Sequence, residues 1–329
     1  MFDQIEASSI VTLLYQTVLG REPDSNGLEQ YVEGLVSGHR TVAQIIREFA
    51  ASPEYAQKRR LLDFNLMQFR KFPDAEVFVP PEVVDQLFDK TSIYWRSAAS
   101  EPNEMYWSVV TEEKWNRELT GDDRVEFIET GKRYANRVLG LYETYSGKSV
   151  ANLTCIDFGS GVGRLAINFA SRVAQVHAVD FSESHLQELQ RNAVMFDCAS
   201  KIMVWPIRLP ADLDKLPQVD LVYSYIALQH NTPPVIAAMM RSLLDHLQPG
   251  GYAFLHVTLA GAGYEGFVVN DYLTSIEAGT RMEIHILPRA NINSLAARAG
   301  CEIVTSHCVG GTYTQYSEEI VFYKPMNGV

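Results

Sequence analysis

The chain has 329 residues, of which 47% are hydrophobic and 21% charged, a composition that is ordinary for a globular protein with a sizeable core. Its formal net charge of −12 disfavours binding to nucleic acid or to an anionic membrane surface, because phosphate groups repel an acidic chain. No stretch reaches the ~18 consecutive apolar residues of a membrane-spanning helix, and the N-terminal residues lack the basic and apolar regions of a secretory signal. We therefore expect a cytoplasmic protein with no integral membrane segment.

Residues 1–60 predict a small all-α domain. Apolar residues recur at helical spacing in three stretches, and the turn sequences "REPDSNG" and "SGHRT" separate them. Thr41 is placed to cap the third helix, and Ser52 followed by Pro53 can begin a fourth. Short helices that share an apolar face in this way pack into a bundle, so we expect a separate helical domain.

Three features of this unit carry a resemblance to a known family. They are the turn "LGREPD", the pattern "GLEQYVEGLVSG" and the terminal "SPEY". Together they resemble the phycobilisome-linker-like helical domains of unknown function, which recur in bacterial chains beside carbohydrate-acting enzymes. The resemblance implies a docking or spacing module that can serve a protein partner. By association it also points to a glycan acceptor.

The sequence after this unit changes its pattern twice. Residues 61–103 carry four prolines in stretches of mixed polarity, so we predict a linker that packs against the next domain. Residues 104–150 return to helical spacing, and from residue 151 short apolar stretches alternate with amphipathic ones, which is typical of a doubly wound parallel α/β sheet. Strands are expected at 153–158, 175–180, 201–207, 219–225, 251–258, 301–306 and 317–324.

The stretch "TCIDFGSGVGRLAINFA" contains the strongest motif of the chain, a glycine loop directly after a strand. A phosphate-binding P-loop would need a lysine and a hydroxyl after the last glycine, and neither follows Gly163. A dinucleotide loop would need a third glycine where Arg164 stands, so a nicotinamide oxidoreductase is disfavoured. The glycines occur instead at alternate positions, which suits a loop passing beside a nucleoside that has no pyrophosphate.

Acidic residues stand at the ends of the first two predicted strands. Asp157 is placed to hold the ammonium group of a ligand, and Asp180 can accept hydrogen bonds from both ribose hydroxyls. Phe181 can cover one face of an adenine, and Ser182 can cap the following helix.

With "VDLVYSYIALQHN" and "LLDHLQPGGYAFLHVTL" following in order, residues from about 104 to 324 resemble a class I S-adenosylmethionine-dependent methyltransferase. The resemblance implies a domain over 104–329 with a Rossmann-like sheet of seven strands, the last antiparallel, and a helical lid within 104–150. It implies S-adenosylmethionine as the cofactor. The residues that it assigns to cofactor binding are Asp157, Gly159, Ser160, Gly161, Gly163, Arg164, Asp180, Phe181, Ser224 and Tyr225.

One part of the sequence departs from this family. The family usually has an acidic residue just after the third strand, which receives the adenine amino group. The stretch here is "MVWPIRLPADL", and Asp212 and Asp214 lie further along the chain. Either the adenine is contacted through the backbone only, or the third strand aligns with the family in a different register.

Candidate catalytic residues follow the fourth and fifth strands. Transfer of a methyl group to a hydroxyl needs a base, and histidine is the usual one. His230 lies at the carboxyl end of the fourth strand, whereas Glu283 and His285 precede the sixth and could face the substrate. Residues 259–282 form a long, glycine-rich segment that could be a substrate lid.

Two classes of function follow from these features. The first is O-methylation of a small-molecule or glycan acceptor. The second is a catalytically silent protein that keeps the cofactor fold and binds partners through its N-terminal unit. The cysteines and histidines have no zinc spacing, so no metal is expected.

Overall fold

The computed structural model describes residues 2–19, 21–55, 75–98, 102–261, 264, 266–312 and 315–326. The chain divides into two compact units, Met1–Arg70 and Lys71–Val329, which we call the helical unit and the α/β unit. No helix within the described ranges is both long and apolar enough to cross a membrane.

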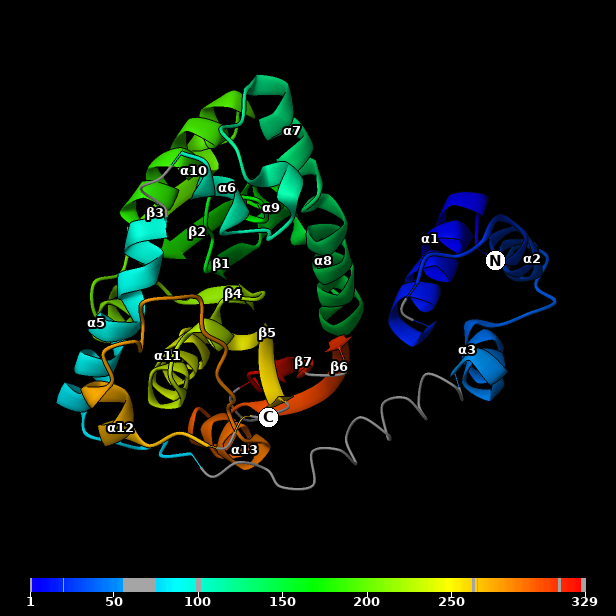
Figure 1. Cartoon of the computed structure of the whole chain (residues 1–329). Coiled ribbons are helices and arrows are strands. Elements are labelled where there is room, and N and C mark those ends of the chain that lie inside the picture. The colour runs from blue at the N-terminus through cyan, green and yellow to red at the C-terminus, as the bar shows by residue number, and fades with distance from the viewer. Residues whose placement is uncertain are drawn as a thin grey trace. The chain divides into compact units, whose positions relative to one another are not determined.

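The helical unit contains α1 (Gln4–Leu14), which continues into a π-helical turn over Tyr15–Leu19, then α2 (Ser25–Val36) and α3 (Val42–Ala51) (Figure 1). Side chains cap each of the three α-helices, including Thr41 at the start of α3, which satisfies backbone N–H groups that the helix itself leaves unpaired. The predicted fourth helix, from Ser52, runs into residues outside the described set.

The helices of this unit enclose a core of their own. Its buried members come from all three helices and the π-helical turn, and three aromatic rings meet edge to face within it. The buried residues are Ala7, Val11, Leu14, Tyr15, Leu19, Val32, Leu35, Ile45 and Phe49.

The α/β unit is built on a sheet that has seven strands within the described residues, in the order β3-β2-β1-β4-β5-β7-β6. Strands β1 to β5 run parallel, and β7 runs antiparallel to both β5 and β6. This arrangement confirms the predicted fold class, including the antiparallel last strand. The strands are β1 (Thr154–Phe158), β2 (Gln175–Asp180), β3 (Ile202–Pro206), β4 (Val219–Ser224), β5 (Leu247–Gly261), β6 (Glu302–Thr312) and β7 (Gln315–Tyr323).

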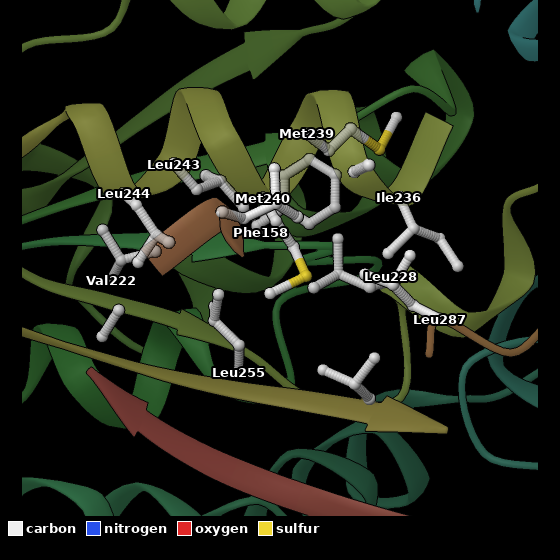
Figure 2. Packing of buried hydrophobic residues seen from close by; sticks show 14 of the residues in the cluster. Phe158, Val222, Leu228, Ile236, Met239, Met240, Leu243, Leu244, Leu255 and Leu287 are labelled. Atoms are coloured by element: carbon white, nitrogen blue, oxygen red, sulfur yellow. The ribbon is translucent and has the colours of Figure 1, made fainter. Parts of the chain in front are cut away.

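Apolar side chains cover both faces of the sheet, because successive strand residues point to opposite sides. On one face Phe158, Val222 and Leu255 pack against Met239, Met240 and other residues of α11 (Figure 2). Fully burying a side chain of this size contributes ~1.5–3 kcal/mol. Helices α5 (Pro81–Ala98), α11 (Pro233–Asp245) and α13 (Arg289–Arg298) contribute to this core.

The opposite face packs against the helices that precede and follow β1. Cys155, Tyr223 and Phe254 point to this side and are buried there. The helices are α6 (Glu104–Trp107), α7 (Gly121–Glu129), α8 (Lys132–Ser146), α9 (Ala166–Ala170) and α10 (Glu183–Met195).

Helix α5 lies in the segment for which the sequence predicted a linker, residues 61–103. Its side chains Leu87 and Phe88 are fully buried in the core beside α11, so residues 75–98 are part of the α/β unit and not a spacer. Two of the four prolines, Pro80 and Pro81, stand at the start of this helix, where a missing N–H costs nothing.

Helix α5 also binds the segment 264–287, which contains α12 (Val269–Thr274) (Figure 1). Lys90 Nζ donates to the main-chain carbonyls of Leu273 and Ser275, at 2.8 and 2.5 Å, and the Tyr94 N–H donates to the carbonyl of Gly279 at 3.1 Å. The part of the predicted lid from Leu273 to Gly279 is therefore held against α5.

Candidate active site

A pocket opens at the carboxyl ends of β1, β2 and β4. The strand order reverses between β1 and β4, and ligands of open α/β sheets bind in the crevice that such a reversal creates. All the cofactor-binding residues predicted from the sequence line this pocket except Gly163 and Ser224. Gly163 packs against Leu189 and Ile167, and the Ser224 side chain is fully buried.

The glycine loop forms the floor of the pocket. Gly159 and Gly161 have φ values of 76° and 50°, in the left-handed region that glycine adopts without strain. A side chain at either position would also meet the opposite wall. A Cβ on Gly161 would lie 2.8 Å from Val109 Cγ2, and one on Gly159 would collide with Ala227. No side chain therefore covers the backbone of Gly159 and Gly161 where it faces the pocket.

Asp180 joins the loops that follow β1 and β2. Its Oδ2 accepts a hydrogen bond from the Gly161 N–H at 2.8 Å, and its Oδ1 accepts one from the Ser182 N–H at 2.9 Å. Ser182 in turn caps α10, as predicted. Each carboxylate oxygen keeps a further lone pair for a ligand, because an ionised carboxylate offers about four acceptor positions.

Asp157 is the least satisfied charged group in this pocket. Its side chain is 1% exposed, and Oδ2 has no hydrogen-bond partner among the described residues. Burial raises its pKa to about 7; the charge of Arg164 opposes this rise and that of Asp180 adds to it. A buried carboxylate oxygen without a partner is costly to the empty protein, and a bound cation would satisfy it.

Arg164 connects the pocket to the helices that precede the sheet. Its guanidinium lies 5.1 Å from the ring centre of Tyr134 and donates to the Thr130 carbonyl at 3.4 Å. The Tyr134 ring contacts that of Tyr225, with 5.0 Å between centroids, and burial raises the pKa of Tyr225.

Residues just after α6 close another side of the pocket, and the sequence did not indicate them. Ser108 and Val109 line it, together with His185 from α10. The Ser108 hydroxyl lies 3.0 Å from His185 Nε2, and nearby Tyr106 donates to Glu188 at 2.7 Å. Part of the predicted lid over 104–150 therefore reaches the pocket through these contacts.

His230 lies beyond the end of β4, in the single turn Leu228–His230. Its Nδ1 is 2.8 Å from the main-chain carbonyl of Glu283, which can only accept, so Nδ1 carries the proton of the neutral ring. Burial lowers the pKa of His230 to about 4; the hydrogen bond to the main chain of Glu283 opposes this change and the charge of His285 adds to it. The ring is therefore neutral at pH 7, and Nε2 keeps its lone pair.

Glu283 and His285, the other predicted catalytic residues, do not line the pocket. The Glu283 carboxylate accepts hydrogen bonds from the Gly279 N–H at 3.0 Å and the Tyr272 hydroxyl at 2.7 Å, and contacts His285 Nε2 at 3.1 Å. These contacts satisfy its oxygens inside the segment 264–287. They direct the Glu283 carbonyl, and not its carboxylate, towards His230.

Two further lining residues were not predicted. Trp95, from α5, contacts the His230 ring with 4.9 Å between centroids. Ile226 has a φ of 54°, a conformation that a β-branched residue adopts only at a cost of ~1–3 kcal/mol. Its side chain is 44% exposed although it lines the pocket, so burial does not compensate for this strain.

The acidic residues after β3 lie away from the pocket. Asp212 accepts hydrogen bonds from the Arg208 and Leu209 N–H groups, at 2.9 and 3.0 Å, and so begins the helical turns at 210–215. Asp214 accepts from the Ser242 hydroxyl at 3.0 Å. Among the described residues, no group of three or more acidic, histidine or cysteine side chains is arranged to hold a metal ion.

Comparison with known proteins adds two family matches. Residues 155–251 match the methyltransferase domain family, and residues 3–59 match a domain of unknown function, DUF4214. The second match supports an N-terminal domain of unknown function and gives no support to the predicted likeness to phycobilisome linkers.

Individual relatives are distant. The chain is 24% identical over 140 residues to a probable cobalt-precorrin-6B C(15)-methyltransferase (decarboxylating) of Methanothermobacter thermautotrophicus, a match that covers 40% of this chain and 70% of the relative. The magnesium protoporphyrin IX methyltransferase of Synechocystis PCC 6803 has 18% identity, a TM-score of 0.49 and coverage of 71% and 98% of the two chains. The 1,6-didemethyltoxoflavin-N1-methyltransferase of Burkholderia thailandensis has 15% identity, a TM-score of 0.48 and coverage of 77% and 94%.

The family match spans β1 to the start of β5 and includes the glycine loop, Asp180, Tyr225 and His230. The sheet order and the pocket at its reversal point agree with that match. The α/β unit therefore contains a methyltransferase domain, and the protein is an S-adenosylmethionine-dependent methyltransferase.

Proposed function

We propose that the protein transfers a methyl group from S-adenosylmethionine to an oxygen atom of a small-molecule acceptor in the pocket above β1, β2 and β4. One observation carries this proposal. The glycine loop with its unpaired carboxylate and the neutral His230 line the same pocket, one after β1 and the other after β4. The pocket therefore offers a place for the cofactor beside a place for an acceptor and its base.

The residues present fit the cofactor. The unpaired Oδ2 of Asp157 would pair with the ammonium of the methionine part, directly or through water, and Asp180 would accept hydrogen bonds from the ribose hydroxyls. The bare backbone at Gly159 and Gly161 would let the nucleoside approach, and Phe181 would cover one face of the adenine.

Bound S-adenosylmethionine supplies a methyl group on a positively charged sulfur, which leaves as a neutral thioether when the acceptor oxygen bonds to the methyl carbon. The protein then contributes mainly proximity and alignment. His230 takes up the hydroxyl proton at Nε2, while its Nδ1–H stays bonded to the Glu283 carbonyl and fixes the ring. Glu283 and His285 act as positioning residues behind His230.

The proposal is tested by replacing His230 with alanine. A general base contributes roughly 10²–10⁴-fold, so His230→Ala should lower the rate of S-adenosylhomocysteine release by that factor, measured with a panel of hydroxylated small molecules and oligosaccharides. Its affinity for S-adenosylhomocysteine should stay nearly unchanged. The matched control is His246→Ala, which removes a buried histidine that directly follows α11 and does not line the pocket. Full turnover by His230→Ala, or an equal loss in both variants, would contradict the role.

We also propose that residues 1–60 act as a docking or spacing module for a protein or a glycan. Their own buried core and the separate family match support a distinct role. Each residue that we assign to the cofactor or the base lies after residue 156.

A further inference from the structure

The two ends of the pocket differ in charge. Asp157, Arg164 and Asp180 belong to the end that the loops after β1 and β2 form. Trp95, Ile226 and His230 lie together at the other end, and none of these three side chains is charged at pH 7, because His230 is neutral. An ionised acceptor would lose its hydration here without gaining a partner.

Trp95 supplies the largest flat surface at this end. It is half-buried and lines the pocket, and its ring is inclined at 56° to that of His230. Its indole N–H forms no hydrogen bond to any described residue. Ile226 also lines the pocket and is held in a strained conformation, which is typical of positions that function maintains.

We propose that the acceptor is an uncharged, planar aromatic molecule with a hydroxyl group, and that Trp95 is the ring on which it stacks beside His230. This inference rests on the methyl transfer proposed for the same pocket. A flat ring would gain stacking against the indole and apolar contact with Ile226.

The polar groups at this end distinguish such an acceptor from a sugar, which can also lie against an indole. A sugar would need several hydrogen-bonding side chains, whereas the Tyr225 hydroxyl already bonds to Tyr134, which leaves the indole N–H and His230.

The basicity of His230 also favours a phenol over a sugar hydroxyl. Its pKa of about 4 makes it a weak base. Such a base suits a phenol, with a pKa of ~10 as in tyrosine, better than an alcohol, which is about as weakly acidic as water at ~16.

The test measures binding to the full-length protein saturated with S-adenosylhomocysteine. The probes are 7-hydroxycoumarin, 2-naphthol and catechol as uncharged phenols, 7-hydroxycoumarin-3-carboxylate as a charged analogue, and methyl glucoside as a sugar. Calorimetry should show saturable binding of at least one phenol. The carboxylate should bind about tenfold more weakly than 7-hydroxycoumarin, and methyl glucoside should show no saturation.

Variants then test whether the Trp95 ring is the surface on which the phenol stacks. Trp95→Ala should weaken phenol binding about tenfold or more, and Trp95→Phe, which keeps an aromatic face, should restore most of it. Affinity for S-adenosylhomocysteine should stay within about twofold in both. Trp205→Ala is the matched control, since that tryptophan is half-buried on β3 and does not line the pocket.

The outcomes separate the two proposals. A wild-type protein that does not bind S-adenosylhomocysteine would overturn the proposed methyl transfer itself. If the cofactor product binds but no phenol does, if methyl glucoside binds more tightly than the phenols, or if Trp95→Ala leaves phenol binding unchanged, the inference about the acceptor is overturned alone.

Discussion

Replacing Asp157 with asparagine should make the empty protein more stable at alkaline pH and its cofactor binding weaker. The substitution keeps the size of the side chain and removes its charge. In the wild type, burial raises the pKa of this carboxyl from 3.8 to about 7. A difference of that size corresponds to about 4 kcal/mol of destabilisation once the group is ionised.

The sign of the pH effect follows from proton uptake. Between about pH 4 and pH 7 the folded protein holds a proton that the unfolded chain has released, so the free energy of unfolding falls as pH rises through this interval. From about pH 5.5 to about pH 8, this single group should remove about 2 kcal/mol of wild-type stability. The free energy of unfolding of Asp157→Asn should lack this pH-dependent loss, because asparagine does not ionise. Urea unfolding of both proteins at the two pH values measures the difference.

Cofactor binding should change in the opposite direction. At about pH 8 the wild-type carboxylate is ionised and would pair with the ligand ammonium. Its loss should weaken S-adenosylhomocysteine binding roughly ten- to a hundredfold, as expected for a charged hydrogen bond of ~1.5–3 kcal/mol. The matched ligand is 5′-methylthioadenosine, which lacks the amino-acid part and should bind both proteins alike. Equal weakening of both ligands, or a variant no more stable than the wild type at pH 8, would refute the reasoning.

Two other changes probe the remaining parts of the molecule. Asp180→Ala should weaken both S-adenosylhomocysteine and 5′-methylthioadenosine roughly ten- to a hundredfold, because both carry the ribose, without unfolding the chain; unchanged affinities in calorimetry would exclude Asp180 from the ribose site. A chain that starts near residue 61 should keep its affinity for S-adenosylhomocysteine within a few-fold and lose binding to a polymeric acceptor or protein partner. If the shortened chain is folded but binds no cofactor product, the helical unit is part of the active site.

Most of the residues that the sequence predicts for cofactor binding line one pocket, because the signals that mark them are local. Asp157 and Asp180 end apolar strands, and parallel strands bring their carboxyl ends to one edge of a sheet. Positions 159 and 161 have positive φ values that favour glycine, so the glycines in the sequence indicate this backbone conformation directly.

The contact between Trp95 and His230 could not be predicted from the sequence, because packing between distant segments forms it. Trp95 belongs to no motif, and it reaches His230 only because α5 folds onto α11. A signal for α5 was present, since Val84, Leu87 and Phe88 have helical spacing after Pro81, but prolines nearby favoured a linker. The sequence did not show that the Glu283 carboxylate faces away from the pocket. Its partners, the Gly279 N–H and the Tyr272 hydroxyl, lie in its own segment and form no recognisable motif with it.

The contacts of α5 with the segment 264–287 have a consequence for how such an enzyme diverges. These two stretches lie on either side of the family-matched part of the chain, residues 155–251, and three hydrogen bonds to the main chain, from Lys90 and Tyr94, join them. Recombination that replaces both stretches together would leave the glycine loop and Asp180 intact while it exchanges Trp95 and the main-chain carbonyl that orients His230. Recombination of either stretch alone would mismatch the pair. The surroundings of His230 can therefore change as a pair of flanking segments while the glycine loop stays constant.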